Sequence, residues 1–286
     1  MTAPGDTTER ALVLGCGYFG LRAARILAAE GVHVTATTTR AERAVELAAE
    51  GLEPALLDLA RPGESAALTS RPDLVICAVA PARDADPRVV FRDGPLAAAR
   101  ILLERGLDPR RFVFTSSTGV YPQKDGSELD EETAADPEDS RHSILRQAEN
   151  RLLQLGAVVL RLGGLYGPGR SPLEWLRRPE IRERILAGCA DAWMNWVRVE
   201  DAAQAAVLAL RRGSRGRLFI VVDDAPVRRR DFYRHAAAVA GLPEPCFAGS
   251  SGDLGKRCSN RRAREELGFR PQFPTYREGL DGLQRH

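Results

Sequence analysis

The sequence of 286 residues is poor in the features that mark secreted, metal-binding and membrane proteins. Its five cysteines are odd in number and show neither C-x-x-C nor Cys/His metal spacing, which argues against a disulfide framework and a zinc site and suits the reducing cytoplasm. No apolar run approaches the length of a membrane span, and the polar first ten residues lack an apolar signal core. We therefore expect a cytoplasmic protein without a metal ion and without a membrane partner.

An excess of charge of one sign is also missing. The formal net charge is +2, and the 28% of charged residues are of mixed sign, so no global field indicates nucleic acid as a partner. Arginine runs at 228–230 and at Arg261, Arg262 and Arg264 are predicted to be solvated faces, the alternative being contact with a phosphorylated substrate. The expected partner is a small molecule.

A strand, a glycine-rich turn and a helix follow one another near the N-terminus. Apolar residues 11–14 precede Gly15-Cys-Gly-Tyr-Phe-Gly20, after which apolar residues recur with helical period before a second apolar strand at 32–36. Gly15 allows the sharp turn, Gly17 lets backbone N–H groups approach a pyrophosphate, and Gly20 lets the helix pack close to the sheet. The helix N-terminus favours the ligand's negative charge. This pattern predicts a dinucleotide-binding βαβ unit; an ordinary tight turn is the alternative.

Strands and helices continue to alternate along the chain. Further strands are expected at 53–58, 73–80, 111–115, 157–161 and 218–222, and helices at 41–50, 93–104, 141–155, 201–211, 230–240 and 260–267. The strand at 73–80 is apolar after Asp73 and is closed by Pro81, as in parallel strands covered on both faces. This order predicts an α/β protein with a Rossmann-type doubly wound parallel sheet.

Shorter elements and more frequent proline follow residue 172, which predicts a small C-terminal lobe closing over the sheet. Asp201 is expected to cap its helix or to lie in the first turn. The expected organisation is a disordered N-terminus at 1–10, a nucleotide-binding domain at 11–163 to which 199–222 return, and a lobe formed by 164–198 and 223–286.

Six segments span nearly the whole chain: Gly15-Cys-Gly-Tyr-Phe-Gly20, Asp58-Leu59, Phe112-Val-Phe-Thr-Ser-Ser-Thr-Gly-Val-Tyr-Pro122, Leu160-Arg-Leu-Gly-Gly-Leu-Tyr-Gly-Pro-Gly169, Asn195-Trp-Val-Arg-Val-Glu-Asp201 and Asn260-Arg-Arg-Ala-Arg-Glu-Glu-Leu-Gly268. In this order the chain resembles the extended and atypical short-chain dehydrogenase/reductase group, the superfamily that includes nucleotide-sugar epimerases and dehydratases. The resemblance implies a Rossmann domain with a C-terminal substrate lobe and NAD or NADP as cofactor. In that superfamily the helices that correspond to 93–105 and 141–155 often form a dimer face, so a monomer or a homodimer is expected.

The resemblance also implies a Tyr-x-x-x-Lys pair on the helix after the fifth strand, in which the tyrosine is the general acid or base. A nearby serine orients the substrate oxygen, and Ser117 matches it. The helix at 141–155, however, contains neither tyrosine nor lysine. If Glu149 is matched to the glutamate that usually follows the lysine by four residues, Arg141 occupies the tyrosine position and Leu145 the lysine position.

A register shifted by one residue gives His142 and Arg146, which keep the i, i+4 spacing of one helix face. His142 would then be an acid/base group that titrates near neutral pH, and Arg146 would bind a ribose or a phosphate. The alternative is that both are solvated helix residues. Tyr121 and Tyr166 are further acid/base candidates in principle, and Tyr166 is expected near the nicotinamide end.

The end of the second strand bears on the choice of cofactor. NAD-binding proteins of this fold place an acid about twenty residues into the motif, whereas Thr35-Ala-Thr-Thr-Thr-Arg40 has no acid before Glu42. Arg40 can pair with a 2′-phosphate, so NADP is favoured over NAD; a surface arginine at a helix start is the alternative. Asp58 is expected beside the adenine or as a cap of its turn. The expected cofactor residues are Gly15, Gly17, Tyr18, Phe19, Gly20, Thr38, Arg40, Asp58, Leu59, Ala80 and Tyr166.

Two functions are consistent with these residues. The first is an NADP-dependent oxidoreductase or epimerase-type enzyme that acts on a hydroxyl or carbonyl of a small, phosphorylated or nucleotide-linked substrate. In this hypothesis Ser117, His142 and Arg146 are the catalytic residues. The second is a regulatory or scaffold protein that kept the cofactor pocket and lost catalysis, as the missing tyrosine and lysine suggest.

Overall fold

A seven-stranded parallel sheet forms the centre of the computed structural model, which describes residues 8–61, 71–80, 85–137, 139–178, 181, 185–249 and 252–284. The strand order is β12-β7-β5-β4-β1-β2-β3. The strands are β1 (Arg10–Leu14), β2 (His33–Thr38), β3 (Glu53–Leu56), β4 (Leu74–Cys77), β5 (Phe112–Ser117), β7 (Val158–Leu162) and β12 (Leu218–Val221). The order reverses between β1 and β4, which is the topological switch point of a doubly wound sheet. The predicted fold class is confirmed.

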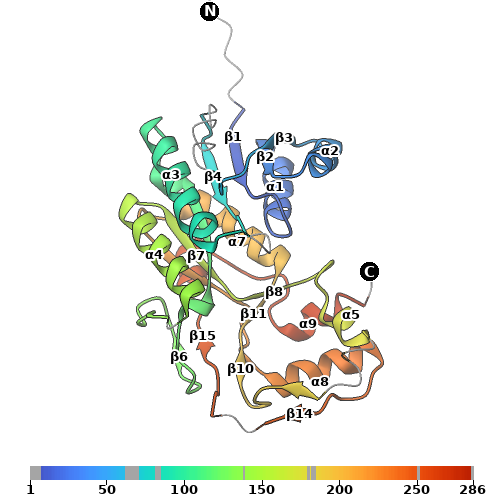
Figure 1. Cartoon of the computed structure of the whole chain (residues 1–286). Coiled ribbons are helices and arrows are strands. Elements are labelled where there is room, and N and C mark those ends of the chain that lie inside the picture. Colours follow the sequence, from blue (N-terminus) through green and yellow to red (C-terminus); the bar gives the residue numbers. More distant parts are fainter. Residues whose placement is uncertain are drawn as a thin grey trace, which may run out of the picture.

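Helices cover both faces of this sheet (Figure 1). On one face α1 (Gly20–Ala29) and α7 (Val199–Arg212) pack over an apolar cluster that includes Val13 and Ala203. On the other face α3 (Gly94–Glu104) and α4 (Ser140–Leu155) pack over a cluster that includes Phe114 and Ala148. β4, β7 and β12 are buried along their whole length, as expected for parallel strands covered on both sides. α2 (Ala41–Ala49) packs beside β3 at the edge.

Several boundaries differ from the sequence predictions. Arg10 belongs to β1 and pairs with His33, so the predicted disorder does not extend to residue 10; residues 1–7 lie outside the described part. β4 ends at Cys77, short of residue 80, and Pro81 is outside the described residues. The helix predicted at 93–104 is preceded by one π-helical turn, η2 (Val89–Asp93). The helix predicted at 260–267 is largely π-helical, η5 (Ala263–Leu267).

A second group of elements lies beyond one end of the sheet (Figure 1). α5 (Pro172–Arg177), α8 (Arg229–Ala240) and α9 (Tyr276–Asp281) pack around a third apolar cluster centred on Phe232. Short pairs of strands accompany them: β8 (Gly164–Tyr166) with β11 (Trp196–Arg198), β9 (Leu186–Ala187) with β14 (Phe247–Ala248), and β10 (Trp193–Met194) with β13 (Val227–Arg228). These elements fall within the predicted lobe.

The C-terminal segment does not stay in that group but returns to the main sheet. β15 (Arg257–Cys258) pairs with β6 (Glu128–Leu129), and η5 contributes Ala263 and Leu267 to the apolar cluster under α7. Asp201 lies in the first turn of α7, as predicted. Its carboxylate accepts hydrogen bonds from the backbone N–H groups of Gln272 and Phe273 at 2.7 and 3.1 Å, so it anchors the returning segment and does not cap its helix.

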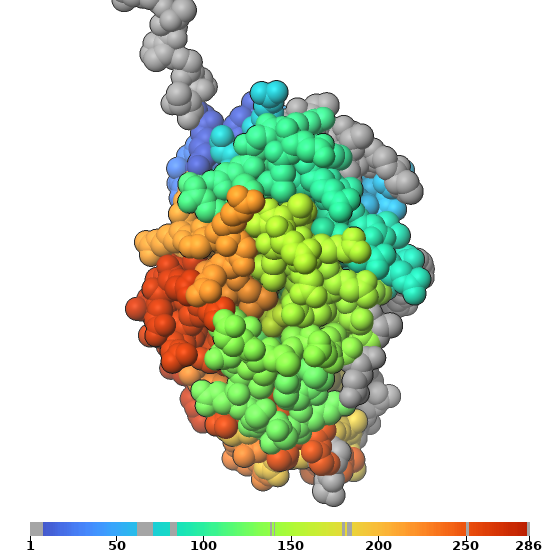
Figure 2. Space-filling model, turned by 90° about the vertical axis from the view of Figure 1, so that its left-hand side faces the viewer, coloured from blue at the N-terminus to red at the C-terminus, as the bar shows by residue number. Residues whose placement is uncertain are grey.

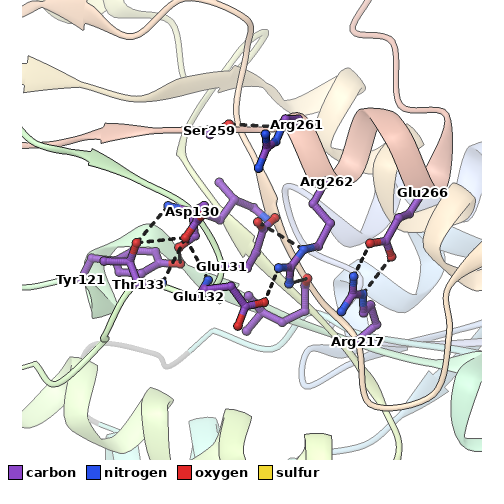
Figure 3. Close-up of polar contacts among 12 residues, drawn as sticks. Tyr121, Asp130, Glu131, Glu132, Thr133, Arg217, Ser259, Arg261, Arg262 and Glu266 are labelled. Atoms are coloured by element: carbon purple, nitrogen blue, oxygen red, sulfur yellow. Dashed lines mark hydrogen bonds and ion pairs between the residues drawn. The ribbon is translucent and has the colours of Figure 1, made fainter.

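Arg262 and Arg264 of this segment form ion pairs and are not solvated faces as the sequence suggested, whereas Arg261 is exposed, as predicted. Figure 3 shows Arg262 between Glu131 and Glu132, with a closest separation of 3.5 Å to the Glu131 carboxylate. Glu131 also accepts a hydrogen bond from the backbone N–H of Ile220 at 2.8 Å. The acidic loop at 125–137 is therefore fastened to the C-terminal segment. In the face shown in Figure 2 this loop (green) lies below α4 (yellow-green).

The arginine run at 228–230 has a similar structural role. Arg230 forms an ion pair with Asp191, and the guanidinium of Arg228 lies 4.2 Å from the centroid of the Trp193 ring. Arg228 also donates a hydrogen bond to the Asp191 carbonyl. These contacts hold β10 and the turn before it against α8.

Candidate functional site

A groove with a cavity of about 630 Å³ runs across the carboxyl ends of the central strands. Most of the predicted cofactor residues line it, together with Ser117: these are Gly15, Gly17, Tyr18, Phe19, Thr38, Arg40, Asp58, Leu59 and Ala80. They come from segments far apart in sequence, and the switch point between β1 and β4 brings them together. The groove is therefore placed where α/β sheets bind their ligands.

The three glycines of the loop have different surroundings. Gly15 has a φ of +85°, and a Cβ on it would lie 2.8 Å from the Ala78 carbonyl oxygen. A Cβ on Gly20 would lie 2.3 Å from the Gly15 oxygen, so this glycine permits the close packing of helix on loop although it does not line the groove. A Cβ on Gly17, in contrast, would meet nothing within 4 Å. The space beside Gly17 is open toward the groove.

The N-terminus of α1 has no capping group of its own. Phe19 is the N-cap residue and its side chain makes no capping hydrogen bond, and no acidic residue lies in the first turn. The loop itself is fixed from β2, because Thr37 accepts a hydrogen bond from the Gly15 N–H on its side-chain oxygen at 2.9 Å and one from the Cys16 N–H on its carbonyl at 2.8 Å. A helix N-terminus left uncapped beside an open cavity is suited to bind a phosphate group.

The end of the groove beyond β2 is basic. Thr38, Thr39, Arg40 and Arg43 line it. Arg43 forms an ion pair with Glu46, whereas none of the described residues forms an ion pair with Arg40. Asp58, at the end of β3, accepts a hydrogen bond from the Ala60 N–H at 2.9 Å. Asp58 therefore both lines the groove and caps its turn.

Arg170, which the sequence prediction missed, contacts the glycine loop at Tyr18. It lines the groove, and its guanidinium carbon lies 4.4 Å from the Tyr18 ring centroid, while that of Arg22 lies 4.3 Å from the same centroid. Burial raises the pKa of the Tyr18 phenol to about 12. A sequence signal was available, because Arg170 directly follows the Leu-Tyr-Gly-Pro-Gly segment.

Arg141 and Leu145 of α4 both line the groove, and the Arg141 guanidinium lies 5.4 Å from the Phe91 ring centroid. These are the residues that take the tyrosine and lysine places when Glu149 sets the register. Glu149 is fully buried, with its carboxylate 2.7 Å from the Arg161 guanidinium. The register set by Glu149 is thus the one that faces the groove.

A second cavity, of about 530 Å³, adjoins the groove at Ser117, which lines both. The Ser117 hydroxyl oxygen accepts a hydrogen bond from the Gly119 N–H at 3.0 Å, which leaves its own proton available. His142 also lines this cavity. The structure therefore brings Ser117 and His142, which lie on different elements, to one cavity.

His142 is held by the residue that caps its own helix. Asp139 accepts the backbone N–H of His142 at 2.9 Å on one carboxylate oxygen, and the other oxygen lies 2.6 Å from the ring Nδ1. The hydrogen bond from this backbone N–H and the contact with the ring lower the pKa of Asp139. A Cβ on Gly119 would lie 2.2 Å from the ring Nε2. With Nδ1 bonded to Asp139, Nε2 is directed to the loop that follows Ser117.

Two predicted site residues lie elsewhere. Arg146 lines neither cavity; its guanidinium donates to the Ala135 carbonyl at 3.0 Å and to Glu149 at 3.2 Å, because its turn of α4 faces the acidic loop. Tyr166 is buried against Trp196 and Phe232, with ring centroids 5.7 and 6.3 Å away. Neighbouring residues of a strand point to opposite sides, so Leu165 of β8 lines the groove and Tyr166 does not.

Lys256 is a second residue that the sequence prediction missed. It lines the cavity with His142, and its ammonium group donates a hydrogen bond to the Tyr121 carbonyl. Burial lowers the pKa of this lysine. The signal that could have identified it is its rarity, because Lys124 and Lys256 are the two lysines among 41 basic residues.

The described residues contain no group of three His, Cys, Asp or Glu side chains that could hold a metal ion. All five cysteines are free. Among the described helices, none is long and apolar enough to cross a membrane.

Comparison with known proteins gives a consistent picture. The model of the NAD dependent epimerase/dehydratase family matches residues 11–221. Protein YeeZ of Escherichia coli is 30% identical over 281 residues, which cover 93% of this chain and 97% of that protein. The 3-diazoavenalumate denitrifying reductase of a Streptomyces species is 28% identical, with 95% and 99% covered. A solved structure of a functionally unknown conserved protein from Silicibacter pomeroyi is 29% identical, with a TM-score of 0.81 and 97% and 99% covered.

Proposed function

The chain belongs to the NAD dependent epimerase/dehydratase family, and from this premise we propose that it is an NADP(H)-dependent oxidoreductase. The substrate is a small molecule whose carbonyl or hydroxyl group reacts beside Ser117. The observation that carries the proposal is that the groove across the strand ends and the second cavity meet at this serine.

The groove fits a nicotinamide dinucleotide. The open space beside Gly17 and the uncapped N-terminus of α1 suit a pyrophosphate. Arg170, stacked on Tyr18, supplies a cation near the same loop. When bound, the dinucleotide supplies or accepts a hydride.

NADP is favoured over NAD because the β2 end of the groove is basic. NAD-specific sites of this fold present a carboxylate to the ribose 2′-OH, whereas here Thr38, Thr39 and Arg40 line that end. A guanidinium without an ion-pair partner among the described residues suits a 2′-phosphate. Arg40 is the residue assigned to that contact.

The catalytic roles fall to residues on both sides of the shared serine. The Ser117 hydroxyl donates a hydrogen bond to the substrate oxygen. His142, in its imidazolium form with Nδ1–H on Asp139, gives the Nε2 proton to that oxygen as it gains negative charge. Arg141 places a permanent positive charge in the groove, where the tyrosine of the family would lie.

One relative supports reductase chemistry but does not identify the substrate of this chain. This relative is a denitrifying reductase of 3-diazoavenalumate, so a related chain performs a reduction. Five free cysteines favour the cytoplasm as the setting. A monomer or a homodimer stays the prediction for assembly.

Fluorescence titration with NADPH and NADH tests the cofactor assignment. We expect NADPH to bind at least about tenfold more tightly, and Arg40→Ala to remove most of that difference, because a charged hydrogen bond is worth about 1.5–3 kcal/mol. Arg100→Ala, an exposed residue on α3 that does not line the groove, is the matched control. A tenfold preference for NADH would refute the role of Arg40.

A second candidate function rests on the same α4 that lacks tyrosine and lysine. A protein that binds NADPH but has lost catalysis would show tight binding in the titration and no turnover. Absorbance of NADPH followed against a panel of aldehydes, ketones and nucleotide sugars separates the two. Turnover of any member establishes the enzyme.

A further inference from the structure

The two lysines of the chain line the same cavity. Of the 41 basic residues, Lys124 and Lys256 are the two that are not arginine. Both lie among the residues that surround the 530 Å³ cavity beside Ser117. Apart from three histidine–carboxylate contacts, arginine is the basic partner in the ion pairs of the described residues, as with Arg161 and Arg262. A lysine presents a compact ammonium with three donors, which differs from the planar fork of arginine.

Backbone hydrogen bonds fix the two lysines on one rim of this cavity. The Leu254 N–H donates to the Lys124 carbonyl at 2.7 Å, and the Gly126 N–H donates to the Gly255 carbonyl at 2.8 Å. Asn195 fastens the second segment, because its side chain donates to the Lys256 carbonyl at 2.9 Å and accepts from the Cys258 N–H at 2.7 Å. The approach of the two lysines is thus built into the backbone.

Neither ammonium group is neutralised by the described residues. Lys256 donates to the Tyr121 carbonyl, which leaves two of its three N–H groups for another acceptor. None of the described carboxylates lies within ion-pair distance of Lys256 or of the exposed Lys124. Two aspartates share the cavity: Asp139 contacts His142, and Asp253 accepts the Gly255 N–H at 2.9 Å. Two like charges are therefore held on one rim, where the charge of Asp253 acts to raise the pKa of Lys256 but none of the described carboxylates forms an ion pair with either ammonium group.

We propose that Lys124 and Lys256 bind an oxyanion of the substrate, a carboxylate or a phosphate, whose reactive group extends to Ser117. This inference rests on the proposed function and names its substrate class: small anionic carbonyl compounds or alcohols. Lys256 is the principal ligand because it is partly buried, where a charge contact is less screened by solvent and salt. Lys124, which is exposed, supplies the second charge.

Isothermal titration calorimetry of the full-length protein with benzoate, inorganic phosphate and neutral benzamide tests the inference. We expect benzoate or phosphate to bind the wild-type protein, and the better of the two identifies the anion. Lys256→Gln, which keeps a donor for the Tyr121 carbonyl, weakens that binding by about tenfold or more. Lys256→Arg restores a large part of it, and Arg100→Gln controls for the change in net charge. Benzamide binds weakly to every variant.

Three results would overturn the inference: benzamide binding as tightly as benzoate, anion binding unchanged in Lys256→Gln, or no saturable binding of either anion. Failure of the proposed function is recognised separately, because NADPH affinity is measured on the same proteins and Lys256 does not line the groove. Anion binding to the cofactor-free protein without NADPH binding would refute the proposed cofactor alone.

Discussion

Glu149 and Arg161 form an ion pair that solvent does not reach, with exposed side-chain fractions of 0% and 2%. The Arg161 guanidinium also lies 4.6 Å from the Tyr121 ring centroid. We expect Glu149→Ala to lower the free energy of unfolding by about 3–5 kcal/mol, because it leaves an unpaired charge in the interior. Urea unfolding followed by circular dichroism measures this loss.

Glu46→Ala is the matched control for that change. It removes the partner of Arg43 in an exposed pair, so its effect should stay within about 1 kcal/mol. Equal losses in the two variants would contradict a special role for the buried pair.

His142 is the residue at which the proposed acid chemistry is tested. We expect His142→Ala to lower turnover by about 10²–10⁴-fold while NADPH affinity is unchanged, because His142 lies in the second cavity and not in the groove. Steady-state kinetics across pH are the measurement, since removal of the acid also removes its limb of the pH profile. Turnover that survives His142→Ala unchanged would exclude the assignment. Asp139→Asn, which keeps a capping oxygen for α4, should give a smaller loss.

At the scale of elements, two glycines of the strand–loop–helix unit have different roles: Gly20 is needed for packing, and Gly17 is expected to be needed for cofactor binding. A Cβ on Gly20 would lie 2.3 Å from the Gly15 oxygen and 3.2 Å from the Val13 side chain. Gly20→Ala should therefore lower the melting temperature by several degrees, since overpacking costs about 1–3 kcal/mol. Thermal unfolding of the cofactor-free protein measures this change.

Gly17→Ala is the counterpart, because its Cβ would enter open space. We expect little change in melting temperature and a loss of NADPH affinity of about tenfold or more, since the methyl group would occupy the approach of the pyrophosphate. If Gly17→Ala binds NADPH as tightly as the wild-type protein, the loop does not hold the phosphates.

Local patterns in the sequence predicted the strand–loop–helix unit and the alternation of strands and helices, because glycine spacing and apolar runs act over a few residues. The same patterns placed Tyr166 at the cofactor, where the alternation of β8 presents Leu165 instead. The register of α4 was left open between Arg141 and His142, and both face cavities, but different ones. Lys256 and Arg170 join the site through contacts between distant segments, which no local pattern encodes.

Asp223 lies where the chain leaves the sheet for the second group of elements. Its protonation makes the stability of the whole molecule depend on pH. Its carboxyl accepts the Ala225 N–H at 3.1 Å on one oxygen, and its other oxygen is buried with no hydrogen-bond partner in the described part of the chain. Burial, and to a lesser extent the nearby Asp224, Asp201 and Glu278, raise its pKa from 3.8 to about 8. The folded protein therefore holds a proton that the unfolded chain releases.

Because the folded pKa is the higher one, the stabilisation from this group is fully present below about pH 4 and is lost as the pH rises through about 8. We expect Asp223→Asn to lose less stability than the wild-type protein between these two values. Urea unfolding at a series of pH values measures the slope. Identical slopes for the two proteins would show that Asp223 does not titrate in this window.

The rim that carries Lys124 and Lys256 joins residues about 130 positions apart. At about 5–20 residues per second, the ribosome adds the second lysine on the order of ten seconds after the first. The glycine loop and β1 to β5 have by then left the ribosome, whereas the second cavity has no rim until residue 256 follows. All segments that line the groove, the last of them at Arg170, are therefore synthesised before the rim of the second cavity is finished.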